Sequence, residues 1–207
     1  MSEAQARKPR RGGWTKQPEE VRRAAILDAA RRCFCQKGYA NTSMQDIASA
    51  AELTKGGVYF HFESKEVILE TLLKDFTDVA RFGLNDPDVL VLDPPARLRE
   101  QIGRLIAGMQ SEGVATIGSL TEAVTRYGVG IEELKKFFVD VVTALTTTLV
   151  EGQKQGVFRQ AEPQLLAEVV LAAVDGLALH QELDHAGINM CSGNQRVLDL
   201  IAACVAT

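Results

Sequence analysis

The sequence is poor in cysteine and in long apolar runs, and each shortage argues against a class of protein. Four cysteines in 207 residues are too few for a scaffold held together by disulfides. The most apolar stretch, residues 165–179, contains Glu168 and Asp175 and is too short to cross a bilayer. No apolar segment follows the basic N-terminal residues as it would in a secretory signal, so we expect a cytoplasmic protein.

Charge is distributed unevenly along the chain. Residues 1–65 carry 12 Lys/Arg against 7 Asp/Glu, a net charge of +5, whereas residues 66–207 carry 11 against 20, a net charge of −9. This asymmetry predicts that the N-terminal part meets a polyanion and that the remainder does not. The hydrophobic fraction of 46% is high enough to bury a core, which excludes a disordered chain.

Apolar residues recur at helical spacing, and no stretch of useful length alternates with the period of a strand. We therefore predict an all-α fold of about nine helices. Their expected ranges are about 18–37, 44–50, 55–60, 65–82, 96–110, 114–127, 131–155, 163–184 and 195–206. Residues 85–95 hold three of the six prolines, and we expect them to form a loop.

Residues 43–62 contain the motif that points to a function. Ser43 can cap a short helix with Asp46 at its third position, although Thr42 with Gln45 is an alternative register. After a break, Thr54 can cap a second short helix, and this layout is typical of a helix-turn-helix. Two consecutive glycines in the second helix, residues 56 and 57, cost about 1 kcal/mol each relative to Ala. Close approach of the backbone to DNA would offset that cost.

The motif and its flanks contain an ordered set of characteristic residues: Gly38-Tyr39, Thr42-Ser43, Ile47-Ala48, Ala51, Thr54-Lys55-Gly56, Val58-Tyr59, His61-Phe62 and Ser64-Lys65-Glu66. Together they resemble the signature of the tetracycline-repressor (TetR) family of bacterial transcriptional regulators. The resemblance covers about residues 20–80. It implies a helix-turn-helix DNA-binding domain at 17–64 and an effector-binding and dimerisation domain at 65–207, and the Arg/Lys/Gly-rich composition of residues 1–16 predicts a basic flexible arm.

The resemblance also implies which residues bind DNA. The second helix of the motif would lie in the major groove. Lys55 and Gly57 would face base edges, whereas Tyr59, His61 and Lys65 would hold phosphates. The complete set of candidate DNA-binding residues is Thr42, Ser43, Gln45, Thr54, Lys55, Gly57, Tyr59, His61 and Lys65. The first three lie at the N-terminus of the motif's first helix, where free N–H groups suit a phosphate.

Three features near the motif allow more than one interpretation. Tyr59 and Phe62 could instead be core residues, and His61 could cap the following helix. The basic arm, with Trp14 among its Lys and Arg residues, could enter the minor groove or remain a solvated tail. Glu52 stands where the family usually has Gly in the turn; because Glu adopts a positive φ less readily, we expect a right-handed variant of the turn.

Two further sites are implied for the C-terminal part. The last two predicted helices carry broad apolar faces that could form a homodimer or only pack internally. The candidate dimer residues are Leu166, Val170, Val174, Leu177, Val197 and Ile201. The candidate residues of a largely apolar effector pocket are Met109, Thr116, Leu120, Phe137, Phe138, Val141, Leu145, Val174 and His180.

We therefore predict a homodimeric, DNA-binding transcriptional regulator that needs no cofactor. In this interpretation it is a repressor, and an unknown small-molecule effector releases it from a palindromic operator. One alternative is a helical enzyme or metal-binding bundle, for which the E-x-x-H spacing of Glu182 and His185 is the only cue. A di-iron bundle needs a second such pair and two more Glu, so we expect no metal and no enzyme. The other alternative is a helix-turn-helix regulator without small-molecule control.

Overall fold

The computed structural model describes residues 18–111, 122–182, 203, 205 and 206, and these residues confirm the all-α prediction. The helices are α1 Glu19–Lys37, α2 Met44–Ala50, α3 Lys55–His61, α4 Lys65–Leu84, α5 Pro87–Leu90, α6 Pro94–Ser111, α8 Ile131–Lys154 and α9 Pro163–Glu182. Residues 122–127 are helical as well. The predicted ranges agree with α1–α4, α6 and α8 to within two residues. The predicted helix at 195–206 and residues 114–121 of another lie largely or wholly outside the described residues.

The predicted loop at residues 85–95 is wrong, because it contains the short helix α5. Asp86 caps this helix by accepting a hydrogen bond from the Asp88 backbone N–H at 2.9 Å, and Pro87 occupies the first helical position. Proline suits that position because its fixed φ is helical and its missing N–H would have no intrahelical partner. The Asp93 carboxylate likewise accepts a hydrogen bond from the Ala96 backbone N–H at 3.0 Å, and α6 begins at Pro94. Two Asp-Pro pairs are therefore helix starts and not loop residues.

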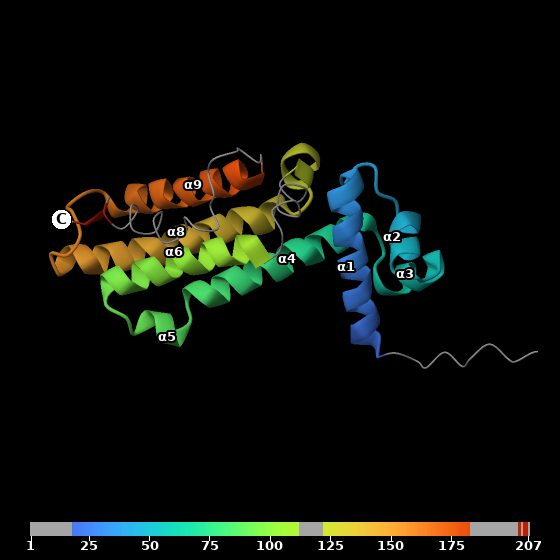
Figure 1. The fold of residues 1–207 in the computed structure, drawn as a ribbon, viewed down its shortest axis with the longest axis horizontal. Coiled ribbons are helices and arrows are strands. Elements are labelled where there is room, and N and C mark those ends of the chain that lie inside the picture. Colours follow the sequence, from blue (N-terminus) through green and yellow to red (C-terminus); the bar gives the residue numbers. More distant parts are fainter. Residues whose placement is uncertain (1–17, 112–121, 183–202, 204, 207) are drawn as a thin grey trace, which may run out of the picture.

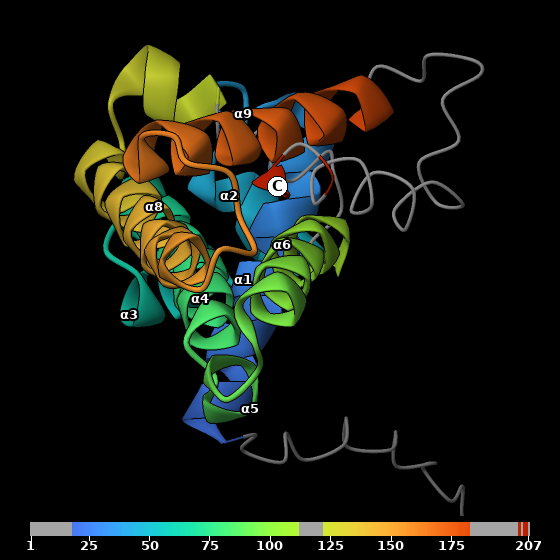
Figure 2. The same ribbon diagram turned by 90° about the vertical axis from the view of Figure 1, so that its left-hand side faces the viewer.

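The helices form two groups that are joined by α4 (Figure 1). The first hydrophobic core gathers buried residues from α1, α2, α3 and the first half of α4, including Ile26, Ile47 and Val58. The second core gathers residues from the second half of α4 and from α6, α8 and α9. Figure 2 looks along this second group and shows α9 lying over the bundle of α4, α6 and α8. The two cores meet within α4, between Leu72 and Ala80, and not at its first residue.

The inner face of α4 is continuous along its whole length. Its buried residues recur at intervals of three and four, as expected for a helix with one apolar stripe; they are Ile68, Leu69, Leu72, Leu73, Thr77, Ala80 and Leu84. Ser64 caps the N-terminus of this helix, because its hydroxyl accepts a hydrogen bond from the Val67 N–H at 3.3 Å. One uninterrupted helix therefore contributes to both cores.

The turn between α2 and α3 differs from the expected right-handed variant, because Glu52 has a φ of 56°. The Leu53 N–H donates to the Ala48 carbonyl at 2.9 Å, and the Glu52 N–H donates to the Ser49 carbonyl at 3.3 Å. These two bonds form a Schellman motif, which requires a left-handed residue after the last helical turn. Leu53 packs against the first core, as the residue after such a turn often does. The prediction was wrong because the carbonyls at the helix end constrain the turn more strongly than the preference of Glu does.

This turn generates a prediction about stability. A non-glycine residue in the left-handed region costs about 1–2 kcal/mol, so Glu52→Gly should raise the free energy of unfolding by about 1 kcal/mol after the extra backbone entropy of Gly is subtracted. Urea unfolding followed by circular dichroism measures this change. Glu63→Gly is the matched control, since Glu63 is also exposed and its φ is not positive. The control should lower stability, and equal effects of the two substitutions would contradict a strained turn.

Candidate nucleic-acid interface

Both short helices of the motif begin with a complete side-chain cap. The Ser43 hydroxyl accepts from the Asp46 N–H at 3.1 Å, and the Asp46 carboxylate accepts from the Ser43 N–H at 2.9 Å. This is the capping box expected for Ser43, and not the alternative register. Thr54 Oγ1 accepts from the Gly57 N–H at 3.1 Å, which caps α3. The caps fix where each helix starts, and thereby fix the rotation of every side chain on α3.

Asp46 is also tied to α1. Its carboxylate pairs with the Lys37 ammonium, and this contact together with the Ser43 hydroxyl holds the pKa of Asp46 well below its usual range. The carboxylate therefore stays charged at physiological pH and serves α1 and α2 together. This ion pair is solvent-exposed, so its effect lies in the orientation of α2 more than in stability.

α3 packs through one residue and exposes most of the others. Val58 is fully buried, whereas Lys55 and Tyr59 are exposed on the same flank, with the Lys55 ammonium 5.8 Å from the centre of the Tyr59 ring. Tyr59 is 44% exposed, so the alternative that it serves as a core residue does not hold. Gly57 and His61 lie half-buried on the other flank, and Arg23 from α1 donates to the His61 carbonyl at 3.3 Å. Phe62 is buried in the first core, as that alternative proposed.

Two of the candidate DNA-binding residues, Thr42 and Lys65, have side chains directed toward the protein interior. The Thr42 side chain is only 3% exposed, and its hydroxyl lies 2.9 Å from the Gly38 carbonyl and 3.2 Å from the Cys33 carbonyl. This side chain therefore closes the connection from α1 to α2 and cannot reach a phosphate. Ser43 and Gln45, by contrast, are exposed at the N-terminus of α2.

Lys65 is the second candidate DNA-binding residue that is directed inward. It links the start of α4 to the segment between α1 and α2. Its ammonium donates to the carbonyls of Tyr39 and Thr42, both at 2.8 Å, and lies 4.3 Å from the centre of the Tyr39 ring. The Tyr39 hydroxyl donates to the Glu66 carboxylate at 3.0 Å, and burial together with this carboxylate raises the pKa of Tyr39. Two of the three ammonium hydrogens of Lys65 are thus used inside the protein, a positioning role that the sequence did not indicate.

The candidate pocket residues are divided between two surfaces of α8. Phe137, Val141 and Leu145, with Val174 of α9, are buried together in the second core. Phe138 lies on the outer side, where it lines an open groove of about 790 Å³ along α8 and α9. The predictions for Met109, Thr116, Leu120 and His180 fall outside the described side chains. Apart from Phe138, the described residues of the predicted apolar pocket are therefore packed core in this conformation.

A smaller and more polar cavity, of about 300 Å³, lies where α4, α6 and α8 meet. Gln101 and Thr148 form its buried wall, with the Thr148 hydroxyl donating to Gln101 Oε1 at 2.9 Å. Arg81, Asn85 and Asp140 line another side. Most of the residues that line this cavity carry hydrogen-bonding side chains, and none of them was predicted from the sequence.

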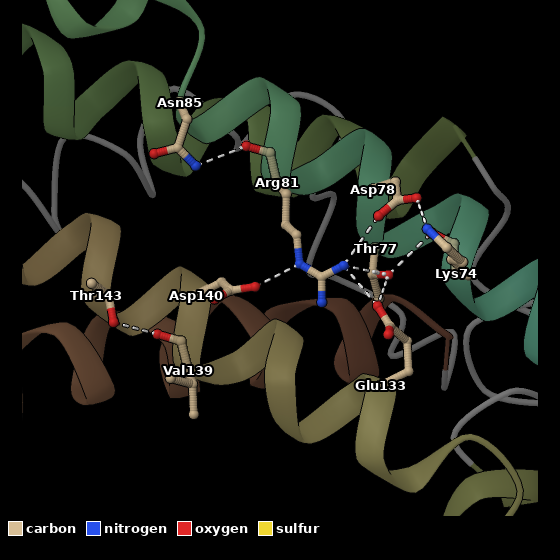
Figure 3. A network of polar contacts seen from close by, with 9 residues as sticks. All are labelled: Lys74, Thr77, Asp78, Arg81, Asn85, Glu133, Val139, Asp140 and Thr143. Carbon is tan, nitrogen blue, oxygen red and sulfur yellow. Dashed lines mark hydrogen bonds and ion pairs between the residues drawn. The ribbon is translucent and has the colours of Figure 1, made fainter.

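Arg81 connects α4 to α8 beside this cavity (Figure 3). Its Nε donates to Asp140 Oδ2 at 2.7 Å, and its Nη1 donates to Glu133 Oε1 at 2.7 Å. The guanidinium lowers the pKa of Glu133, which also accepts from the Thr77 hydroxyl at 2.8 Å. Arg81 Nη2 is buried and has no hydrogen-bond partner in the described ranges. The network thus joins the two helices and leaves one donor available.

The candidate dimer residues on α9 face the wrong way for an interface. Val170 and Val174 are buried in the second core, and Leu166 packs against it. Leu165 and Val169, on the opposite side of α9, are 57% and 58% exposed. Val170 and Val174 therefore match the alternative of internal packing and not the expected dimer contact. The Leu177 side chain, Val197 and Ile201 fall outside the described set.

The described residues lack the features of a membrane-spanning or metal-binding protein. None of the described helices combines the length and the apolar character needed to span a bilayer. In the described ranges no three His, Cys, Asp or Glu side chains gather as metal ligands would, and His185 lies outside them. Cys33 is buried in the first core, and this burial raises the pKa of its thiol.

The helix-turn-helix motif and the chain around it resemble known proteins. A family model described as "Bacterial regulatory proteins, tetR family" matches residues 26–72, from the middle of α1 to the middle of α4. The repressor DhaR of Mycobacterium sp. (strain GP1) is 28% identical over 164 residues, which cover 78% of this chain and 83% of that protein. The A-factor receptor protein of Streptomyces griseus is 28% identical over 163 residues, 77% of this chain and 55% of that protein.

Solved structures share the whole fold. The TetR family regulator PfmR from Thermus thermophilus superposes with a TM-score of 0.75 at 24% identity, over 86% of this chain and 97% of that one. The SmeT–triclosan complex gives 0.71 at 22% identity, over 90% and 92% of the two chains. At these identities the structural likeness concerns the fold, whereas the family model and the relatives identify the motif. The chain is therefore a DNA-binding transcriptional regulator of the TetR family and not an enzyme.

Proposed function

We propose that the chain is a repressor that binds a palindromic operator as a homodimer and that a small-molecule effector releases it. The observation that carries this proposal is the presentation of α3: its inner residue is fully buried, both caps of the motif are complete, and its outer residues are exposed. A seven-residue helix contacts too few bases to specify a site alone, so two copies related by a two-fold axis are required. The name of the relative DhaR, a transcriptional repressor, supports the direction of control.

In this proposal residues 17–64 bind DNA, residues 65–207 bind the effector and the second subunit, and α4 belongs to both. Lys55 and Gly57 face base edges, and Tyr59 and His61 hold phosphates. The exposed Ser43 and Gln45 offer the N-terminus of α2 to a further phosphate, while Thr54 caps α3. Lys65 retains one ammonium hydrogen for DNA and otherwise positions the motif.

The distribution of charge supports a role for the N-terminal arm. Residues 18–65 carry seven Lys/Arg and six Asp/Glu, a net charge of only +1, whereas residues 1–17 carry five against one, a net charge of +4. Phosphate neutralisation supplies most of the sequence-independent affinity for DNA. We therefore assign the arm a contact with the phosphates or the minor groove next to the site that α3 occupies.

Selection of bound sequences from random duplex DNA tests DNA recognition. The purified protein should enrich a symmetric site, and native mass spectrometry should find two chains on each duplex. The double variant Lys55→Ala, Tyr59→Phe should bind that site roughly 100- to 1,000-fold more weakly with an unchanged melting temperature, because two contacts of about 1 kcal/mol are lost in each of the two half-sites. Lys136→Ala on α8 removes the same charge from an exposed residue of the body and should change nothing. Enrichment of no symmetric site would refute the proposal.

The dimer contact is assigned to the outer face of α9 and the adjoining groove. Leu165 and Val169 are exposed there, and Phe138, Val139 and Val142 of α8 line the groove beside them. Exposed apolar surface of this extent is typical of a site that another protein covers. A second copy of the chain satisfies the need for two recognition helices, so it is the occupant we propose.

The substitution Val169→Glu should convert the dimer to a monomer, because it places a charge in an apolar contact. Light scattering after size exclusion measures the mass. Val79→Glu is the matched control, since Val79 is 67% exposed on α4, away from the groove. A dimer that persists in Val169→Glu and dissociates in Val79→Glu would place the interface elsewhere.

Effector control is assigned to the polar cavity beside Arg81. A ligand there would contact Asn85 on α4 and Thr147 on α8, and one of its acceptor atoms could receive the unpartnered Arg81 Nη2 hydrogens. Such a ligand interacts with the residues that join α4 to α8, so it can favour a different relative position of these helices. The ligand can weaken operator binding by no more than the ratio of its affinities for the two arrangements.

Arg81→Met should abolish the response to effectors while the protein still folds. The assay is anisotropy of a labelled operator, titrated with compounds that displace the wild-type protein. Arg104→Met is the matched control, because Arg104 also forms two ion pairs, with Asp86 and Glu100, but none with α8. A response of Arg81→Met at the same concentrations as the wild type would contradict this route. If no compound in a broad panel displaces the wild type, the regulator acts without small-molecule control.

A further inference from the structure

Phe60 is exposed to an extent that the fold does not explain. Its side chain is 78% exposed, more than any other large apolar side chain of α1, α2 or α3. The only ring contact of Phe60 among the described residues is an edge-to-face contact with the neighbouring His61, at 5.1 Å between ring centres and 90° between planes. This contact orients the ring and does not bury it. The described part of the chain therefore leaves most of the Phe60 ring uncovered.

The position of Phe60 on α3 shows where the ring points. Successive residues of a helix are rotated by about 100°, so Phe60 lies about 200° from the buried Val58 and projects almost directly away from the core. Gly56, one turn earlier, lies on the same outward line, and a Cβ atom built there would meet nothing within 4 Å. The outermost line of α3 therefore consists of a bare backbone followed by one aromatic ring.

A helix that enters the major groove presents its outermost line to the base edges. Lys55, Tyr59 and His61 carry hydrogen-bonding groups on the flanks of that line, whereas Phe60 carries none. The thymine C5-methyl is the apolar group that the major-groove edges display, and Phe is among the side chains that contact it. We propose that Phe60 recognises a thymine methyl group in each half-site and so determines part of the operator sequence. This inference rests on the proposed entry of α3 into the major groove.

The inference can be tested at the level of one methyl group. In the duplex obtained by selection, each symmetric pair of thymines is replaced in turn by deoxyuridine, which lacks only the C5-methyl. The wild-type protein should lose roughly five- to twentyfold in affinity at one symmetric pair and little at the others, because two buried methyl groups are removed per operator. Phe60→Ala should bind the thymine duplex more weakly and should not distinguish it from the deoxyuridine duplex.

Two further variants separate methyl recognition from general weakening. Phe60→Leu keeps an apolar side chain and should keep part of the thymine preference. Tyr59→Phe removes only a hydroxyl from the flank, so it should weaken binding to both duplexes and leave their ratio unchanged. Because Phe60 is mostly exposed, Phe60→Ala should melt at the wild-type temperature, which excludes loss of folding as the cause.

Each other outcome overturns the inference in an identifiable way. Equal binding of thymine and deoxyuridine duplexes by the wild type, with weak binding by Phe60→Ala, would assign the ring to the sugar-phosphate backbone. Unchanged DNA binding by Phe60→Ala would remove Phe60 from the interface and leave it for a protein partner. A selected site without a thymine shared by both half-sites would also overturn it. Only the absence of any selected symmetric site would overturn the proposed function as well.

Discussion

The constraint on which the rest of the structure depends is that one helix, α4, is buried in both hydrophobic cores. Its inner stripe runs from Ile68 in the first core to Leu84 in the second without a break. The start of α4 is fixed by Lys65, which donates to two carbonyls of the connection between α1 and α2. Its second half is fixed to α8 by Arg81. Because a continuous helix is stiff, α4 provides the route by which the proposed effector control would transmit a displacement of α8 to the helices of the motif.

The Arg81 network suits this task better than apolar packing would. Arg81 is mostly buried while Glu133 and Asp140 are partly exposed, so removal of one partner leaves charge in a poorly solvated place. Apolar contacts tolerate small shifts, whereas hydrogen-bonded ion pairs depend on distance and angle. A joint made of such pairs therefore has few arrangements of similar energy, which is what the proposed effector control requires.

Local interactions made part of the molecule predictable from its sequence. Ser43 and Thr54 were identified as caps because a cap involves residues three positions apart, and both form as expected. The left-handed conformation of Glu52 was not predicted, because it follows from the way α2 ends and not from the conformational preference of Glu. Thr42 and Lys65 were expected at the DNA surface because their partners, the carbonyls of Cys33 and Tyr39, are backbone atoms that no sequence pattern displays.

The proposed dimer face and the proposed effector site were less predictable for a different reason. Apolar residues occur on more than one side of α9, so helical period alone cannot decide whether Val169 or Val170 faces the core. Contact with α8 decides it, and that contact depends on the fold. Likewise, the polar cavity brings together Arg81, Gln101 and Thr148 from three helices, and no sequence pattern joins them. The apolar pattern from which the pocket was predicted corresponds mostly to the packed core.

The glycines of α3 show how function can be inferred from an unfavourable choice of residue. Gly57 has a reason within the protein, because a Cβ there would lie 3.3 Å from the hydroxyl that caps the helix. Gly56 has no such reason, since a Cβ at that position would lie in open space. It still lowers helix stability by about 1 kcal/mol relative to Ala. In the proposed function, close approach of the α3 backbone to DNA offsets this cost, and the exposed side chains beside Gly56 would support that approach.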